Sequence, residues 1–125
     1  MTSPLPLTRA TFIAFHIQWR APEEFKYESE TEKIDVWSLG NILYYLLTRQ
    51  EPYYENHSDE VPDRVMEGKV PSIKDAAILN STHIFDTTLL KVIHICWQYD
   101  PKERPSSLQV ASMMQEALEQ IKSIT

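Results

Sequence analysis

The sequence is poor in glycine and cysteine, and each shortage excludes a class of site. The two glycines, Gly40 and Gly68, lie too far apart to form either glycine-rich phosphate loop, Gly-x-Gly-x-x-Gly or Gly-x4-Gly-Lys-Ser/Thr. Cys96 is the only cysteine, so the chain can form no internal disulfide and no thiolate cluster around a metal. We therefore expect a reducing setting, intracellular and cytoplasmic.

Positive charge and long hydrophobic runs are also scarce. The chain has 12 Lys and Arg against 18 Asp and Glu, a formal net charge of -6. Non-specific nucleic-acid binding and attachment to an anionic membrane both need a basic face, so we expect protein partners, with no nucleic acid and no membrane. The longest apolar run, residues 42–47, is far shorter than the roughly 20 residues of a spanning helix. Residues 1–17 do not read as a secretory signal.

What is present is helical periodicity. No segment shows the clean alternation of a half-buried strand, so we expect a mainly α fold. The helices are predicted at residues 32–49, 59–67, 87–98 and 107–123, with a loop over residues 70–85. The first helix is apolar on nearly all sides, through Ile42, Leu43, Tyr44, Tyr45, Leu46 and Leu47. Such a helix is normally surrounded by other protein, which predicts a helical packet around one central buried helix.

The other helices have clearer faces and ends. The second carries little apolar surface and ends at Gly68, a residue that readily takes the left-handed closing conformation. The third has one apolar face, and the last is predicted to carry an apolar stripe of Leu108, Ala111, Met114, Leu118 and Ile121. Ser29 with Glu32, and Ser106 with Gln109, have the spacing of a capping box at a helix start.

Ordinary catalytic patterns are absent from the sequence. The four histidines, His16, His57, His83 and His94, form no pair at i, i+4 with an intervening glutamate, so a zinc-protease helix is not supported. There is no Gly-x-Ser-x-Gly nucleophile turn. Cys96 lies in a predicted helix beside Trp97, and we expect a buried, inert thiol there.

Three blocks of sequence stand out in order. They are Gln18-Trp19-Arg20-Ala21-Pro22-Glu23-Glu24, then Lys33-Ile34-Asp35-Val36-Trp37-Ser38-Leu39-Gly40, then Cys96-Trp97-Gln98-Tyr99-Asp100-Pro101-Lys102-Glu103-Arg104-Pro105. Together they resemble the eukaryotic protein kinase family: the Ala-Pro-Glu that closes the activation segment, the start of the central helix of the C-terminal lobe, and the loop between its last two helices. The resemblance implies a partial kinase domain at residues 18–123, after an irregular segment, residues 1–17, that is not clearly kinase.

The resemblance implies structural roles for Ala21, Pro22, Glu23, Asp35, Trp37, Gly40 and Arg104. Glu23 matches a family glutamate that pairs with the arginine at the position of Arg104. From spacing alone, Glu23 would be only a first-turn acid following Pro22.

Two other matched positions allow both a family role and a simpler one. Asp35 matches an aspartate that accepts backbone hydrogen bonds from the catalytic loop, but it is also an acid in the first turn of its helix. Without that loop, its carboxylate must stay hydrated or raise its pKa. Trp37 is expected in the core, and Gly40 inside a helix indicates close packing by a neighbour, which in the family is other backbone of the lobe.

A working kinase also has a glycine-rich loop, a strand lysine paired with a helix glutamate, a His-Arg-Asp loop with its asparagine, and an Asp-Phe-Gly metal ligand. None of these motifs is in the chain. We therefore predict no catalytic, cofactor-binding or metal-binding residue here and no intrinsic kinase activity; ATP and Mg²⁺ are implied only for a complete parent domain. Phe15-His16-Ile17-Gln18 departs from the family pattern, so serine/threonine or tyrosine specificity does not transfer.

Three hypotheses remain open at this point. The first, which we favour, is a piece of a longer protein kinase whose partners are the missing N-terminal lobe and catalytic loop. The second is a stand-alone, non-catalytic module that docks a protein partner through the helix at 59–67 and the acidic stretch at 51–60. The third is an acidic helical domain with accidental motifs. Under the first two, the lobe should expose apolar surface that normally meets the missing helices.

Overall fold

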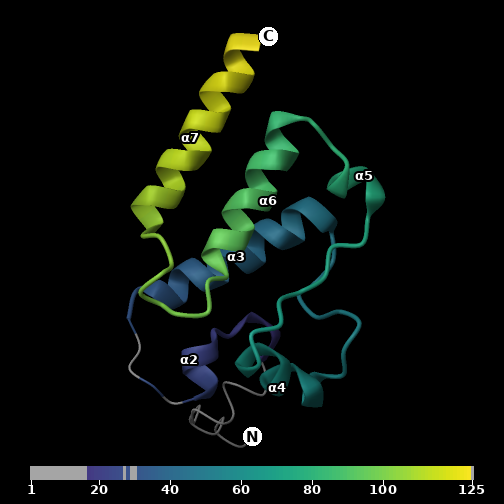
Figure 1. Cartoon of the computed structure of the whole chain (residues 1–125), viewed down its shortest axis with the longest axis vertical. Coiled ribbons are helices and arrows are strands. Elements are labelled where there is room, and N and C mark those ends of the chain that lie inside the picture. Colours follow the sequence, from purple (N-terminus) through teal and green to yellow (C-terminus); the bar gives the residue numbers. More distant parts are fainter. Residues whose placement is uncertain (1–16, 27, 29–30, 125) are drawn as a thin grey trace, which may run out of the picture.

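The chain folds as a set of α-helices, shown in Figure 1, in a computed structural model that describes residues 17–26, 28 and 31–124. The helices are α2 (Pro22–Phe25), α3 (Lys33–Thr48), α4 (Val61–Met66), α5 (Ala76–Leu79), α6 (Ile84–Cys96) and α7 (Ser107–Ile124), with 3-10 helices at Ile17–Trp19 and Ser58–Glu60. No strand occurs within these described ranges. The prediction of a mainly α fold is confirmed.

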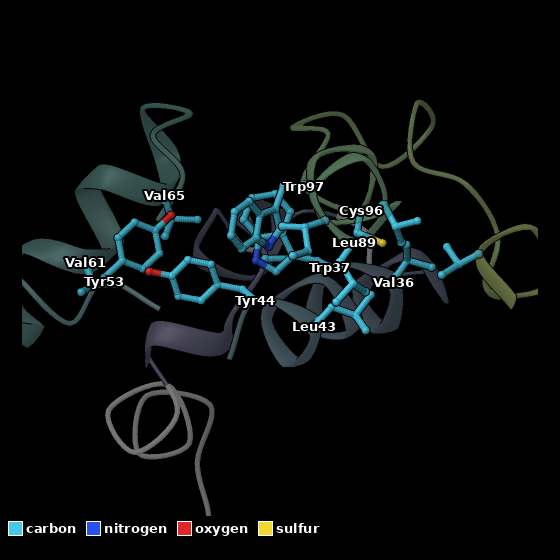
Figure 2. Packing of buried hydrophobic residues seen from close by; sticks show 14 of the residues in the cluster. Val36, Trp37, Leu43, Tyr44, Tyr53, Val61, Val65, Leu89, Cys96 and Trp97 are labelled. Atoms are coloured by element: carbon cyan, nitrogen blue, oxygen red, sulfur yellow. The ribbon is translucent and has the colours of Figure 1, made fainter. Parts of the chain in front are cut away.

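The three longest helices pack in series: α3 contacts α6, and α6 contacts α7, while α2 and α4 meet each other at the opposite end of the molecule (Figure 1). Apolar residues of α3 and α6 form most of the core between them, and Figure 2 shows Trp37 and Trp97 near its middle. Burying each large aliphatic side chain here contributes about 1.5–3 kcal/mol relative to exposure. The core therefore lies along α3, as the sequence predicts.

One face of α3 is nevertheless uncovered. Val36, Trp37 and Tyr44 are no more than 2% exposed, whereas Ile42 is 50%, Tyr45 42% and Leu46 51% exposed. The prediction of a packet around one central helix is confirmed for the side that faces α6, but the further expectation that other protein surrounds this helix is wrong for the described chain. Its apolar residues do encircle the helix, but no described segment packs over the second side.

The region between α4 and α6 is more regular than predicted. The expected loop over residues 70–85 contains α5, whose first turn is capped by Asp75, with Oδ1 accepting the Ala77 N–H at 2.9 Å. Helix α6 starts at Ile84 rather than at 87, because His83 Nδ1 accepts the Phe85 N–H at 3.0 Å. Side chains that cap locally therefore extended the helical content beyond what periodicity predicted.

The capping box at the start of α7 is confirmed. The Ser106 hydroxyl accepts the Gln109 N–H at 3.1 Å, and Gln109 Oε1 accepts the Ser106 N–H at 2.7 Å. The other predicted box depends on Ser29, which lies outside the described residues. Helix α3 starts one residue later than predicted, at Lys33, and ends at Thr48, with Arg49 in the left-handed conformation at φ 62°.

The buried face of α7 differs from the predicted stripe. Leu108 is 78% and Leu118 44% exposed, whereas Val110 is 2% and Ala117 9% exposed. Both sets lie on apolar sides of one helix, and contact with α6 selects the side that carries Val110 and Ala117. The stripe prediction is therefore wrong as a description of the buried face, apart from the partly buried Met114 and Ile121.

Helix α4 carries more of the core than expected. Val61 is 2% and Val65 0% exposed, and both belong to the main apolar cluster. The prediction that this segment contributes little apolar surface is wrong, because both of its valines are buried in the core. Gly68 has φ +81°, so the predicted left-handed stop is confirmed.

Candidate functional site

The Ala-Pro-Glu block forms a buried single helical turn, α2. Pro22 occupies the first helical position, where its missing N–H leaves no donor unsatisfied and its fixed φ suits the helix. Ala21 is fully buried, and its N–H donates to Glu24 Oε1 at 3.0 Å. Arg20 Nη1 donates to the other oxygen of the Glu24 carboxylate. The turn is thus closed by polar groups on both sides of Pro22.

Glu23 and Arg104 form the predicted ion pair. Arg104 Nη1 donates to Glu23 Oε2 at 2.6 Å, and Nη2 donates to Oε1 at 2.7 Å, which is the parallel two-bond geometry of the strongest carboxylate pairs. Each of the two residues is 2% exposed. The pairing implied by the resemblance is confirmed, and the reading of Glu23 as a simple first-turn acid is insufficient.

The remaining donors of Arg104 bind backbone carbonyls. Nε donates to Gln98 O at 2.7 Å, Nη1 to Lys33 O at 3.1 Å and Nη2 to Tyr99 O at 3.1 Å. With the two bonds to Glu23, every N–H of the guanidinium has an acceptor. The guanidinium carbon also lies 4.9 Å from the centre of the Trp37 ring. Burial of this charge is therefore fully compensated by the fold.

Lys33 completes a reciprocal link that the sequence reasoning missed. Its Nζ donates to Arg104 O at 2.5 Å, while its own carbonyl accepts from Arg104. The first residue of α3 and the loop before α7 therefore hold each other through both side chains. Lys33 opens the second motif block at the start of a helix, but a separation of 71 residues gave no reason to join it to Arg104.

Asp35 sits on the first turn of α3 and is exposed. Among the described residues, no hydrogen bond or ion pair involves its carboxylate. The carboxylate is thus open to water. The helix-dipole reading applies here, and the family role remains a prediction because it depends on a loop that is not in this chain.

Trp37 and Gly40 have the packing roles that the sequence predicts. Trp37 is 2% exposed, beneath the Arg104 guanidinium. A Cβ on Gly40 would lie 2.8 Å from the Cβ of Cys96 and 3.0 Å from Nε1 of Trp97, so no side chain fits there. The close neighbours are side chains of the α6 end, not backbone as expected from the family.

Asn41 links two parts of the fold through its side chain, and the sequence analysis did not identify it. It is 1% exposed, its Nδ2 donates to Trp19 O at 3.2 Å, and its Oδ1 accepts from Trp97 Nε1 at 3.1 Å. It therefore joins the segment before α2 to the end of α6. A lone amide beside Gly40 in an otherwise apolar helix was the signal that could have revealed it.

The described side chains include one thiol, that of Cys96, which is buried. Burial raises the pKa of the Cys96 thiol to about 11, and the nearby positive charge of Arg104 lowers it only in part, so the thiol stays protonated and inert as predicted. Within the described ranges, no three His, Cys, Asp or Glu side chains lie together so that they could hold a metal. The same ranges include no helix long and apolar enough to cross a bilayer. The contacts among Glu23, Lys33 and Arg104 hold α2, α3 and the loop before α7 together, which is a structural role.

Comparison with known proteins agrees with this geometry. A family description of the protein kinase domain matches residues 7–119. The match starts before residue 18, where the three motif blocks begin, and the boundary drawn there remains a prediction because residues 7–16 lie outside the described chain.

Relatives of both kinase classes align with the chain. It is 34% identical over 98 residues to RGS domain-containing serine/threonine-protein kinase A of Dictyostelium discoideum, covering 78% of this chain and 8% of that protein. It is 34% identical over 104 residues to the insulin-like growth factor 1 receptor of Bos taurus (82% and 15%), and 27% identical over 106 residues to tyrosine-protein kinase TXK of Mus musculus (84% and 19%). The chain spans less than a fifth of each of these relatives. The Glu23–Arg104 ion pair is formed, and the family match covers residues 7–119. The chain therefore belongs to the protein kinase domain family.

Proposed function

We propose that this chain is the helical C-terminal part of a protein kinase domain, and that it supports phosphoryl transfer from ATP to protein only within a longer parent. In that parent, other segments supply the nucleotide site and the catalytic loop. The chain alone is proposed to be inactive, since none of the groups that position and stabilise a transferring phosphoryl is in its sequence.

The observation that carries this proposal is the outer face of α3, defined by Asp35, Ile42, Tyr45 and Leu46. Asp35, Ile42 and Leu46 follow the i, i+7, i+11 spacing of one helix side. Asp35 at its start has no described donor, and Ile42, Tyr45 and Leu46 are 42–51% exposed. An open acceptor beside an apolar stripe is the surface expected to receive the remainder of a kinase domain.

The size and composition of the native protein test the proposal. An antibody raised against residues 107–125 captures the endogenous protein, and mass spectrometry identifies its peptides. A band far above 14.6 kDa with His-Arg-Asp peptides supports a longer kinase. A band at 14.6 kDa contradicts it.

Activity of the chain alone gives an independent test. With Mg²⁺, ATP and a general protein substrate, we expect phosphate incorporation equal to that of a blank without protein. Incorporation above the blank that follows the chain through two purification steps would contradict the proposed inactivity.

The second candidate function is a non-catalytic module that binds a protein partner. The exposed acids in and around α4 favour it: Asp59, Glu60, Asp63 and Glu67 are all exposed. A partner of opposite charge would be steered to them. Binding that weakens when these acids are changed to amides, in a native protein of 14.6 kDa, would support this candidate over the first.

Specificity and location are proposed only in coarse terms. Aligned relatives carry both serine/threonine-protein kinase and tyrosine-protein kinase in their names, so either class of protein hydroxyl is compatible with the parent. We propose an intracellular, cytoplasmic setting, supported by the single buried cysteine and by a function that depends on ATP.

A further inference from the structure

The loop between α3 and α4 carries two adjacent tyrosines with opposite surroundings. Tyr53 is 7% exposed, has φ 59°, and donates its hydroxyl to Lys69 O at 2.5 Å. Tyr54 is 45% exposed. The turn that places Tyr53 in the core therefore leaves Tyr54 accessible. Tyr54 lies outside the helices, so a modifying enzyme can bind this segment without unwinding a helix.

Tyr54 lines a cavity of about 250 Å³ whose walls also include Arg64, Lys69 and Lys74. These cations come from α4, from the turn after it and from the segment that leads to α5. Arg64 Nε is buried and makes no hydrogen bond to any described group; Glu60 Oε2, its nearest carboxylate oxygen, is 3.8 Å away. The cavity thus combines positive charge with a donor that has capacity left.

Glu55, the residue after Tyr54, already binds one of these cations, because its Oε2 accepts from Lys74 Nζ at 2.6 Å. The adjacent Glu55 carboxylate also raises the pKa of the Tyr54 hydroxyl. A second negative group placed on the Tyr54 oxygen would compete with Glu55 for Lys74.

We propose that Tyr54 is a phosphorylation site, modified by a protein tyrosine kinase acting on this chain, and that Lys74, Lys69 and Arg64 then bind the phosphate. The phenolic oxygen attacks the γ-phosphorus of ATP, an O–P bond forms as the bond from γ-phosphorus to the β,γ-bridging oxygen breaks, and ADP leaves. The phenolic proton passes to the modifying kinase and then to solvent. The phosphate brings a charge of about -1.5 to -2 and three strong acceptors, which suits two lysines and an arginine.

The other described tyrosines are less suited to modification. Tyr44 is fully buried, with its hydroxyl on Ser72 O at 2.7 Å, and the Tyr99 hydroxyl donates to Met66 O at 2.8 Å. Tyr45 is exposed but lies inside α3, so presenting it as an extended strand requires unwinding that helix. Tyr54 is the described tyrosine that combines an exposed ring, an irregular backbone and a cationic cavity.

Site-specific phosphorylation tests the first half of the proposal. The folded chain is incubated with Mg²⁺, ATP and the catalytic domain of a tyrosine kinase, and tandem mass spectrometry locates the phosphate. We expect Tyr54 to react at least about tenfold faster than Tyr53, because Tyr53 reacts only after local opening. In a synthetic peptide of residues 48–60 that preference should shrink. Equal rates in the folded chain, or no phosphate on Tyr54, would overturn the assignment.

Thermal unfolding tests the second half. Phosphorylation of Tyr54 should raise the melting temperature by about 4 °C through the new charge-assisted bonds. Lys74→Gln should reduce that rise, and the double variant Lys69→Gln with Lys74→Gln should abolish it. Both variants should hardly change the melting temperature of the unmodified protein. Lys91→Gln, at an exposed position of α6 outside the cavity, is the matched control and should leave the rise intact. An unchanged melting temperature, or a rise that survives in the double variant, would overturn phosphate binding by this cavity.

Discussion

Removal of the Arg104 guanidinium should be the most damaging single change to a charged residue in this fold. Arg104→Ala leaves the Glu23 carboxylate 2% exposed with no cation, and leaves three backbone carbonyls without their donor. Breaking a buried pair on one side costs about 3–5 kcal/mol. A domain of this kind has a total stability of about 5–15 kcal/mol, so the loss is a large share of it.

The assay is urea unfolding followed by far-ultraviolet circular dichroism, which reports the helices directly. The matched control is Arg64→Ala, because Arg64 also faces a glutamate but at 3.8 Å and with side chains 39% and 53% exposed. That surface pair is worth about 0–1 kcal/mol. We expect the Arg104 variant to lose several times more unfolding free energy than the Arg64 variant, or to be unfolded without urea.

A double variant separates the pair from the loss of volume. Glu23→Leu with Arg104→Met removes both charges together, so its cost should be well below the sum of the two single changes. If Arg104→Ala costs no more than Arg64→Ala, the reasoning from the buried pair is refuted, and the hypothesis of accidental motifs regains support.

The remaining predictions concern packing, capping and protonation. Gly40→Ala should lower the melting temperature, with a loss of about 1–3 kcal/mol, because its Cβ would lie 2.8 Å from that of Cys96; an unchanged melt would contradict the close approach. Ser106→Ala should cost about 0.5–2 kcal/mol by removing the cap on Gln109 N–H, and Ser107→Ala, one residue into the helix, is the control. Asn41→Leu should destabilise by about 1–3 kcal/mol, since the buried indole N–H of Trp97 loses its acceptor and Trp19 O loses its donor. Cys96 should resist alkylation at pH 8 in the folded chain and react on unfolding, and fast reaction in the folded state would contradict its burial. Because burial raises the folded pKa of this thiol from 9.0 to about 11, its contribution to stability is present below pH 9 and is lost as the pH rises towards 11, which a urea titration across that range measures.

The ion pair and the cap of α7 show what the sequence alone could predict. Ser106 and Gln109 are three residues apart, so their reciprocal hydrogen bonds follow from local geometry and were predicted without any fold. Glu23 and Arg104 are 81 residues apart, and only resemblance to the kinase family joined them. Asn41 was missed because its partners, Trp19 and Trp97, are brought to it by packing and not by spacing.

The sequence by itself determined the mainly helical class, the family and the identity of its structural motif residues, because helix periodicity, capping and motif chemistry are properties of short segments. Only the tertiary structure decided which apolar faces are covered. Helix α3 is apolar around its circumference, yet contact with α6 covers one side and leaves Ile42 and Leu46 about half exposed. Likewise α7 turns Val110 inward and Leu108 outward. Periodicity marks a surface as apolar, but the element that buries it comes from elsewhere in the chain, so burial is a property of the assembled fold.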